Sequence, residues 1–236
     1  MNALITGGSR GIGLAIAKEL AIEGFNIFIA SKNQESIEKA KKELLALNSL
    51  IKVEGFATNF EDPTLATKSI LDWLNNKTKS IDLFVLNAGI FIDGSISDFS
   101  EKNYNLNMDV NFTINFKLIQ AILPFVKKST TKRIVLIGST AAYEPYPLVP
   151  TYGIIKYALK GLAINLRTEL MKENIGVTFI SPGGTKTDMW EGVDLPENRL
   201  LAPSDIGKIV ALIPKLSSQA VIDELIIRPM LGDIHE

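Results

Sequence analysis

The sequence has no cysteine, and its only histidine among 236 residues is His235. The absence of cysteine excludes disulfides, zinc–thiolate sites and thiol nucleophiles. With one histidine next to the end of the chain, and no G-x-S-x-G sequence, a serine hydrolase triad has no support. Metal-dependent hydrolysis lacks ligands for the same reason, and we expect no metal site. Any catalysis must come from other residue types.

A charge excess of either sign is also missing, because 25 basic residues balance 26 acidic ones and leave a formal net charge of -1. Nucleic acids and anionic membranes are therefore not expected as partners. No segment approaches the ~18 uninterrupted apolar residues that a membrane helix needs. Met1 leads into an apolar strand without the pattern of a signal peptide. We expect a soluble, cytoplasmic protein, although the lack of cysteine indicates the compartment only weakly.

Short, β-branched apolar runs alternate with longer amphipathic stretches along the whole chain. Short runs that are apolar throughout are typical of parallel strands covered on both faces. The length and the 46% hydrophobic content fit one globular domain over residues 1–236. The sequence thus predicts a doubly wound α/β fold, with a mainly parallel, seven-stranded, Rossmann-like sheet. The expected strands are 3–5, 26–30, 51–57, 82–86, 133–137, 177–180 and 225–227.

Three helix starts can be predicted from capping residues, namely Asp62 before Pro63, Ser100 and Ser204. Only one long irregular region is expected, at about 183–203, and a loop of that length usually has a function. We predict a substrate lid there. Its large apolar side chains could face an apolar ligand or pack on the domain; they are Met189, Trp190, Leu195, Leu200 and Leu201.

The first predicted strand is followed by a glycine-rich turn, TGGSRGIG at 6–13, and then by a helical pattern. Glycine lets the backbone approach a pyrophosphate, and a helix N-terminus offers unpaired N–H groups to it. A glycine-rich sequence alone could be an ordinary tight turn. The order of strand, turn and helix nevertheless fits a dinucleotide site.

The end of the second predicted strand bears on coenzyme choice. An NAD enzyme of this fold places Asp or Glu there to hold the ribose hydroxyls, whereas this chain has Ser31, Lys32 and Asn33. Together with Arg10 of the glycine turn, these residues would suit a 2'-phosphate, which favours NADP(H) over NAD(H). The alternative is that Arg10 and Lys32 are ordinary solvated surface cations.

Tyr152 and Lys156 lie four residues apart in TYGIIKYALKG, so a helix would place the phenol and the ammonium on one face. A neighbouring positive charge favours the phenolate and moves the tyrosine pKa down from ~10, toward the range in which a general acid or base works. Proton chemistry is thus possible without histidine.

Five motifs in order resemble the short-chain dehydrogenase/reductase family in its compact form: TGGSRGIG, NAG at 87–89, Ser139, the Tyr152/Lys156 pair and PGGTKT at 182–187. The resemblance spans essentially the whole chain. It implies that Tyr152 is the general acid or base and that Lys156 lowers its pKa and holds the nicotinamide ribose. It also implies that Ser139 hydrogen-bonds the substrate oxygen, although a serine after a strand can simply cap a turn. Asn111 matches a position that helps to hold a water in the proton relay.

The resemblance also implies a set of coenzyme contacts. Asn59 stands where an aspartate often touches adenine, and 182–187 contains the segment that meets the nicotinamide carboxamide. Tyr143, Tyr146 and Tyr157 have no lysine at i+4 and are expected in the pocket wall or the core. The full set of expected coenzyme residues is Gly7, Ser9, Arg10, Gly11, Ile12, Gly13, Ser31, Lys32, Asn59, Asn87, Ala88, Gly89, Tyr152, Lys156, Pro182, Gly183, Thr185 and Thr187.

The function that follows is an NADP(H)-dependent carbonyl reductase or alcohol dehydrogenase acting on a ketone or secondary alcohol. A non-catalytic NADP(H)-binding sensor or scaffold is the alternative from another class. Within the reductases, a 3-oxoacyl carrier-protein reductase stays open, but the basic residues of 127–133 are expected far from the strand carboxyl ends, which favours a small free substrate. The short tail after 225–227 leaves little chain for building a substrate site. Apolar residues on several faces of 103–128 and 152–172 predict a homodimer or homotetramer.

Overall fold

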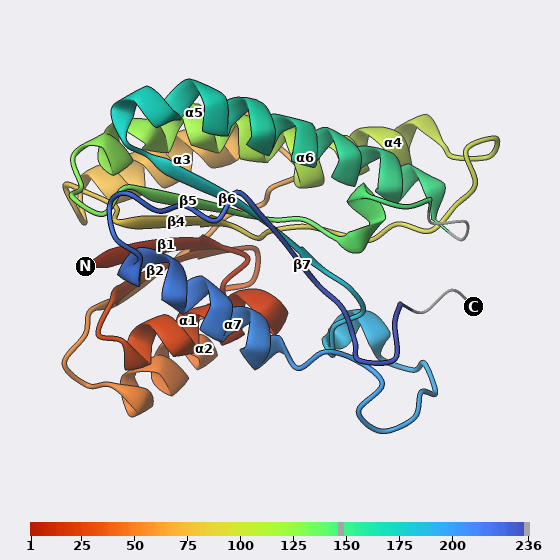
Figure 1. Ribbon diagram of the computed structural model, residues 1–236, viewed down its shortest axis with the longest axis horizontal. Helices are drawn as coiled ribbons and strands as arrows, with labels where there is room; N and C mark the ends of the chain where they lie inside the picture. The colour runs from red at the N-terminus through yellow and green to blue at the C-terminus, as the bar shows by residue number, and fades with distance from the viewer. Residues whose placement is uncertain (146–148, 234–236) are drawn as a thin grey trace.

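The computed structural model describes residues 1–145 and 149–233 and contains one seven-stranded sheet (Figure 1). Its strand order is β3-β2-β1-β4-β5-β6-β7, and every neighbouring pair is parallel. The order reverses between β1 and β4, as expected for a doubly wound fold. The predicted strands are thereby confirmed, and the predicted first or last residue of several strands differs from the observed one by one or two positions. Their bounds are β1 Asn2–Thr6, β2 Asn26–Ser31, β3 Val53–Ala57, β4 Leu83–Leu86, β5 Arg133–Ile137, β6 Gly176–Pro182 and β7 Glu224–Ile227.

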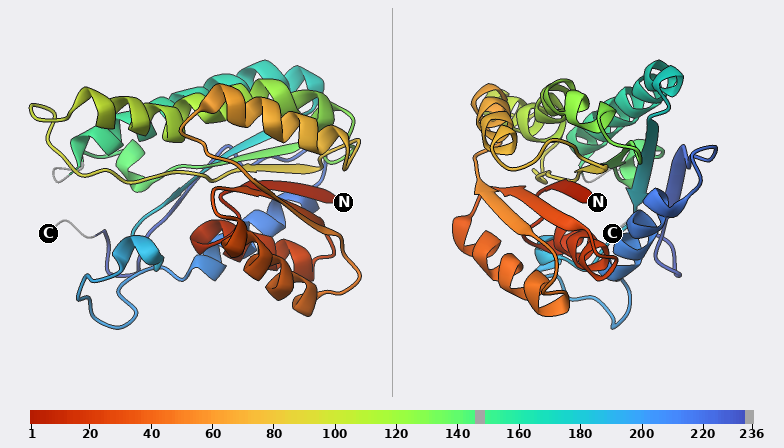
Figure 2. Two further views of the ribbon diagram at one scale, coloured as in Figure 1. Left: turned by 180° about the vertical axis from the view of Figure 1, so that it is seen from behind. Right: turned by 90° about the vertical axis from the view of Figure 1, so that its left-hand side faces the viewer.

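Helices cover both faces of the sheet (Figures 1 and 2). Successive side chains of a strand point to opposite faces, so Leu4 of β1 joins one apolar cluster and Ile5 joins the other. One face carries α1 Gly11–Ile22, α2 Gln34–Leu47 and α7 Pro203–Leu212. The opposite face carries α3 Pro63–Asn75, α4 Glu101–Met108, α5 Ile114–Lys127 and α6 Pro150–Leu170.

The segment 103–128, predicted as one helical stretch, is divided in the structure. A π-helical turn, Asp109–Thr113, joins α4 to α5. A π-turn widens the backbone by one residue and is frequent at functional sites. It contains Asn111, whose side chain is buried among backbone groups, so the mid-helix asparagine has a local reason.

Two of the three predicted helix starts are confirmed. The side chain of Asp62 accepts a hydrogen bond from Leu65 N at 2.9 Å, and that of Ser100 accepts one from Asn103 N at 3.2 Å. The prediction for Ser204 is wrong, because α7 begins at Pro203 and no side chain caps it. The proline ring fixes a helical φ at the first position, so the helix starts one residue earlier.

The expectation of a single long irregular region is also wrong. Residues 87–100, between β4 and α4, form a second irregular segment at the same edge of the sheet. The predicted lid, 183–203, contains a short 3-10 turn at Asp188–Trp190 and is closed at its base. There, Leu201 N donates to Gly184 O and Lys186 N donates to Leu201 O, both at 2.9 Å. The side chain of Met189, one of the expected lid residues, lies outside what the structure describes.

Within the described ranges, no helix combines the length and apolar character needed to cross a membrane.

Candidate active site

The glycine-rich turn lies at the carboxyl end of β1, against the end of β4. Gly7 has a φ of +66°, a conformation that favours glycine. A Cβ at Gly13 would overlap the carbonyl oxygen of Gly7 and lie 2.5 Å from Asn87 Nδ2. Both positions therefore require glycine, so the turn is more than an ordinary tight loop.

Thr6 and Asn87 fix the geometry of this turn. The hydroxyl of Thr6 accepts hydrogen bonds from the backbone N–H groups of Asn87 and Ala88, each at 3.0 Å. Asn87 Nδ2 donates back to Thr6 O at 3.0 Å and to Gly7 O at 3.2 Å. Sequence reasoning missed Thr6 as a functional residue, although it is the first residue of the glycine motif.

The start of α1 can receive an anion. The helix begins at Gly11, and Arg10 before it has an extended backbone and makes no side-chain cap. The first N–H groups of a helix have no partner within the helix and carry a positive partial charge. Ser9 and Ile12 flank this position and are half-buried. The glycine-rich turn, which we call the glycine cradle, and the open N-terminus of α1 together fit the pyrophosphate of a dinucleotide.

The region in which a 2'-phosphate is expected contains Ser31 and Lys32, at the end of β2, and Arg10, in the glycine turn. The hydroxyl of Ser31 is buried and has no hydrogen-bond partner among the described residues, which suits a ribose or phosphate oxygen. Lys32 Nζ lies 2.6 Å from Glu61 Oε1, and Arg10 Nη1 lies 3.1 Å from Asp188 Oδ2. Both cations are thus exposed but paired with carboxylates rather than solvated alone.

Glu61 is held in its charged form by this arrangement. The hydrogen bond from Lys32 lowers the pKa of the Glu61 carboxyl, and Asn59 contributes as well. Asn59 Oδ1 accepts from Glu61 N at 3.2 Å, so the expected adenine contact orders the segment that carries Glu61. An arriving 2'-phosphate would have to compete with Glu61 for Lys32.

Tyr152 and Lys156 lie in the first turns of α6, and the Lys156 ammonium is 5.2 Å from the centre of the Tyr152 ring. Lys156 is only 6% exposed. A Cβ at Gly89 would lie 3.9 Å from Lys156 Nζ and 2.8 Å from Asn111 Oδ1. The structure therefore brings Tyr152, Lys156 and Asn111 together around the backbone of Gly89.

Both polar atoms of the Asn111 side chain form hydrogen bonds with neighbouring residues. Its Nδ2 donates to Ile90 O at 3.1 Å and to Asn107 Oδ1 at 2.6 Å, and its Oδ1 accepts from Ile90 N at 3.1 Å. These bonds join the π-turn to the segment after β4. Asn111 thus holds backbone beside Lys156, and sequence reasoning missed Asn107 as its buried partner.

Ser139 follows β5 and serves the local structure as well as the site. Its hydroxyl accepts from Ala141 N at 3.2 Å and caps the 3-10 turn Thr140–Ala142. The first turn of α6 packs on that turn, since a Cβ at Gly153 would lie 3.5 Å from Ala141 O. Ser139 and Tyr152 are thereby placed on touching segments; the structure shows the capping role of Ser139, and its role toward substrate stays a prediction.

Phe91 is a further residue that sequence reasoning missed. Its ring centre lies 5.3 Å from that of Tyr152, at an interplanar angle of 60°. Phe91 comes from the irregular segment 87–100, two residues beyond Gly89. Its position in the segment that follows β4 is the signal that could have identified it. Phe91 covers part of the Tyr152 ring with an apolar side chain.

The PGGTKT segment follows β6 and runs past the glycine turn. Pro182 ends β6 and is buried, and Gly183 N donates to Ile227 O at 2.8 Å. Thr185 is buried, with its hydroxyl on Gly183 O at 2.9 Å. A Cβ at Gly11 would lie 3.2 Å from Thr187 Cγ2. The segment thus connects the sheet end to the coenzyme turn.

The rival tyrosines have other roles. Tyr143 OH donates to Glu224 Oε2 at 2.7 Å, and burial together with this carboxylate raises the pKa of Tyr143 to about 12. Lys160 lies 3.6 Å above its ring, a lysine that the i+4 criterion could not find because it comes from another element. Tyr157 is half exposed on α6. Tyr146 lies outside the described residues.

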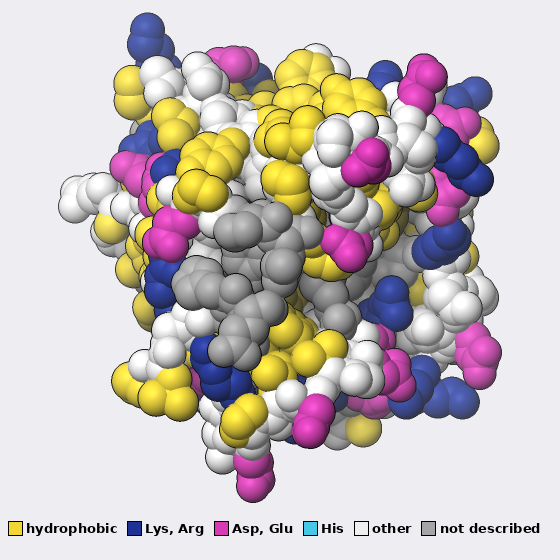
Figure 3. Space-filling model, turned by 90° about the vertical axis from the view of Figure 1, so that its right-hand side faces the viewer, with side chains coloured by type: hydrophobic (Ala, Val, Ile, Leu, Met, Phe, Trp, Pro, Cys, Tyr) yellow, Lys and Arg dark blue, Asp and Glu magenta, His cyan; other side chains and the backbone are white. Residues whose placement is uncertain are grey.

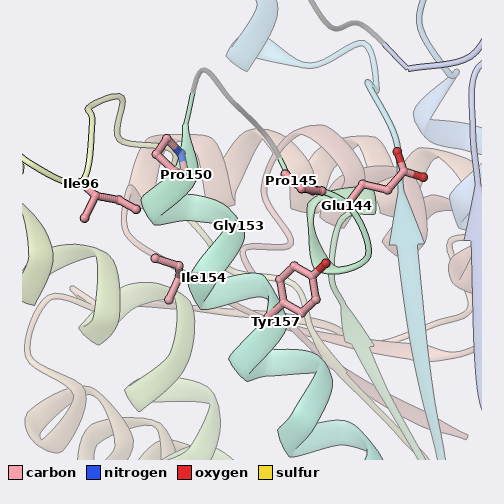
Figure 4. A pocket seen from close by; sticks show the side chains of 7 residues that line it. All are labelled: Ile96, Glu144, Pro145, Pro150, Gly153, Ile154 and Tyr157. Carbon is pink, nitrogen blue, oxygen red and sulfur yellow. The ribbon is translucent and has the colours of Figure 1, made fainter.

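An apolar hollow of about 300 Å³ lies beside the start of α6 (Figure 4). Pro150, Gly153, Ile154 and Tyr157 recur at helical spacing and line one face of the helix. Tyr152 and Lys156 lie on a different face by the same periodicity, so the hollow is distinct from the Tyr152/Lys156 pair. Figure 3 looks at the side of the molecule where the strands end and shows hydrophobic side chains gathered in the upper part of that surface.

Comparisons with known proteins agree with this geometry. A model of the short chain dehydrogenase family matches residues 1–198. An uncharacterized oxidoreductase of Staphylococcus epidermidis is 29% identical, over 97% of this chain and 96% of its own. Dehydrogenase/reductase SDR family member 4 of Caenorhabditis elegans is 32% identical, over 95% and 92% of the two chains. A short chain dehydrogenase from Burkholderia cenocepacia, solved in complex with NADP, has a TM-score of 0.86 at 28% identity and 96% coverage of both chains.

Proposed function

Since the chain belongs to the short-chain dehydrogenase/reductase family of oxidoreductases, we propose that it is an NADP(H)-dependent enzyme that interconverts a ketone and a secondary alcohol. The observation that carries this proposal is the pairing of Tyr152 with the buried Lys156 at 5.2 Å, beside Gly89 and Asn111. Such a pair places a proton donor next to a fixed positive charge.

The proposed proton chemistry rests on residues of this chain. The coenzyme, when bound, supplies or accepts the hydride. Tyr152 gives its phenolic proton to the carbonyl oxygen during reduction and takes it back during oxidation. Lys156 stabilises the phenolate by its charge. The hydroxyl of Ser139 donates to the same substrate oxygen, where negative charge develops.

Asn111 is proposed to position rather than to react. Its Nδ2 is used by Ile90 and Asn107, and its Oδ1 accepts from Ile90 N, so we propose that the water of the proton relay depends on the backbone that Asn111 holds in the π-turn. Phe91, against the Tyr152 ring, would exclude bulk water from the reacting oxygen.

Coenzyme choice is proposed from the fit of the site. The glycine cradle and the open start of α1 suit the pyrophosphate, while the unpartnered Ser31 hydroxyl, Lys32 and Arg10 suit a 2'-phosphate. The second strand lacks the acidic residue that an NAD site would use. The NADP complex of the Burkholderia relative supports the same choice.

The substrate is proposed to be a small free carbonyl compound or alcohol. The basic cluster of residues 127–133 lies at the opposite, amino-terminal edge of the sheet, where Lys127 ends α5 and pairs with Glu173 at 2.8 Å. Arg133 there is buried and donates to Ser217 O at 2.9 Å. This cluster therefore does not support the alternative of a 3-oxoacyl carrier-protein reductase.

The cytoplasmic location stays a prediction.

Fluorescence titration with NADPH and with NADH, followed by a panel of ketones and aldehydes while NADPH absorbance is monitored, tests the proposal. Tight NADPH binding with carbonyl-dependent oxidation is the expected result. A preference for NADH would contradict the assigned roles of Arg10 and Lys32. Tight NADPH binding without turnover on the panel would favour the non-catalytic sensor.

We further propose a homo-oligomer formed through α4, α5 and α6. Large apolar side chains on these helices are half exposed in the single chain, and the hollow beside α6 continues this surface. Exposed apolar side chains that gather on one surface often mark a protein interface. The side chains concerned here are Tyr104, Phe116, Ile154, Tyr157 and Ile164. Light scattering at micromolar concentration should give a dimer or tetramer mass. A clean monomer would refute this proposal.

A further inference from the structure

The residues after β7 form a short segment, Arg228–Asp233, which we call the C-terminal strap. A turn in the strap is closed by Gly232 N donating to Pro229 O at 2.9 Å, and Gly232 has a φ of +82°. A second turn in the lid is closed by Arg199 N donating to Pro196 O at 3.1 Å, with Asn198 at a φ of +60°. Asparagine and glycine tolerate this conformation best.

Arg199 joins the two turns. Its Nη1 donates to Gly232 O at 2.8 Å, and its Nη2 donates to Asp233 O at 3.0 Å. A guanidinium is a rigid fork of donors, so it can grip two successive carbonyls in a way that the single ammonium of lysine cannot. The strap is thereby attached to the lid two residues before the lid's base at Leu201.

The strap is fixed at its other end by Arg228. Arg228 Nη2 lies 2.7 Å from Glu144 Oε1, and Arg228 Nη1 pairs with Asp233, whose side chain is 4% exposed. Glu144 belongs to the segment between Ser139 and Tyr152. The strap therefore connects the lid to the segment that carries catalytic groups.

The absence of a side chain at Gly183 leaves room for this strap. A Cβ there would lie 2.9 Å from Pro229 Cδ and 2.5 Å from Asp233 Oδ1. The strap thus packs directly on the segment that leads from β6 into the lid. The sequence predicts little chain after the last strand for building a substrate site, and the few residues there do contact Arg199 of the lid.

We propose that Arg199 is a positioning residue, which fixes the substrate lid to the C-terminal strap and, through Arg228 and Glu144, to the segment before Tyr152. Nothing in this arrangement requires Arg199 to touch substrate or coenzyme. Its consequence for substrate binding rests on the proposed reductase function, whereas the attachment of the lid does not.

Hydrogen–deuterium exchange of the full-length protein with NADPH tests the attachment directly. Arg199→Ala should speed exchange of amides in 186–201 and in 228–233 by about tenfold, as expected for the loss of two charged hydrogen bonds. Arg199→Lys should give a smaller acceleration, because it keeps the charge and loses the fork. The matched control is Arg167→Ala, which removes another arginine ion pair, with Asp223 at 2.8 Å, before β7.

Two outcomes would overturn the proposal. One is exchange of 186–201 in Arg199→Ala equal to that of the unchanged protein. The other is an equal acceleration in Arg167→Ala, which would indicate general loosening.

The carbonyl with the highest turnover in the panel then gives the catalytic readout. Arg199→Ala should raise KM severalfold, with kcat and NADPH affinity retained. An unchanged KM beside faster exchange would refute the positioning role for substrate. Failure of all carbonyls would refute the reductase instead, and the exchange comparison would still decide whether the strap holds the lid.

Discussion

The coenzyme side and the substrate side of the site are built in different ways. On the coenzyme side, residues next to the ends of β1 and β4 hold one another by short-range bonds between backbone and small polar side chains, as Thr6 and Asn87 do. On the substrate side, Arg199 joins the lid to the strap, and an ion pair between Arg228 and Glu144 joins the strap to the segment before Tyr152.

This difference has a mechanical consequence. The glycine turn follows β1 directly and is hydrogen-bonded to residues at the ends of β1 and β4, so it should be rigid. The substrate side depends on exposed charged groups, whose pairs are individually weak, so it should open locally at low cost. The same enzyme thus has a fixed coenzyme half and an adjustable substrate half.

The largest expected effect is a loss of turnover that leaves both the coenzyme half and the substrate half unchanged. Tyr152→Phe removes only the proton-transferring hydroxyl, so turnover should fall by about 10² to 10⁴. NADPH affinity and exchange protection of the lid should stay as they are, since neither depends on the phenol. Steady-state kinetics and a fluorescence titration measure the two quantities. Full turnover in this variant would refute the role of Tyr152.

A substitution in the rigid half should damage coenzyme binding and stability together. Gly13→Ala places a methyl group onto Gly7 O and Asn87 Nδ2, and forced overpacking of this kind costs about 1–3 kcal/mol. NADPH affinity should drop at least about tenfold as the cradle shifts. Gly161→Ala in α6 is the control, because nothing lies within 4 Å of its Cβ. That control should be stabilised by roughly 0.5–1 kcal/mol.

Chemical denaturation and coenzyme titration of the two glycine variants provide the comparison. Equal NADPH affinities in Gly13→Ala and Gly161→Ala would show that the cradle is adjustable rather than rigid.

Glu61→Gln tests the competition for Lys32. Removing this carboxylate should tighten NADPH binding by about two- to fivefold, the scale of an exposed ion pair, and leave NADH affinity unchanged. The lowered pKa keeps Glu61 charged throughout about pH 6–8, so the gain should be constant over that range. Glu173→Gln, which removes a carboxylate paired with Lys127 at 2.8 Å on the opposite edge of the sheet, removes an equal charge elsewhere. An equal gain in both variants would indicate a general charge effect instead.

The smallest expected effect concerns Tyr143 at the border of the substrate half. Its pKa of about 12 in the folded state lies above the value of ~10 for an unfolded chain. Its contribution to stability is therefore complete below about pH 10 and is lost as the pH rises through the folded pKa. Tyr143→Phe should make the free energy of unfolding fall less steeply between about pH 10 and 12.

The half-exposed Tyr157 is the control for this slope. Urea unfolding of Tyr157→Phe at the same pH values should show the slope of the unchanged protein. Equal slopes in Tyr143→Phe and Tyr157→Phe would contradict the pairing of the partly buried Tyr143 with Glu224.

The contrast between the two halves also explains what the sequence could predict. Glycine spacing, apolar strands and the Tyr152–Lys156 interval are local patterns, so the sheet and the proximity of Tyr152 to Lys156 could be predicted from them. Phe91, Arg199 and Lys160 act through contacts between distant segments, which no local period encodes. The predicted helix start at Ser204 was wrong because the helix begins one residue earlier, at Pro203, whose ring favours the first helical position over a capping serine.

The central claim is that Tyr152 and Lys156 serve NADP(H)-dependent carbonyl reduction. Its most direct test uses NADPH carrying deuterium at C4 of the nicotinamide, in both stereochemical forms, with the most rapidly reduced carbonyl of the panel. Mass spectrometry should find one deuterium on the carbinol carbon with one of the two forms, and about 10² to 10⁴ less product with Tyr152→Phe. Coenzyme binding without deuterium in any product would contradict the claim.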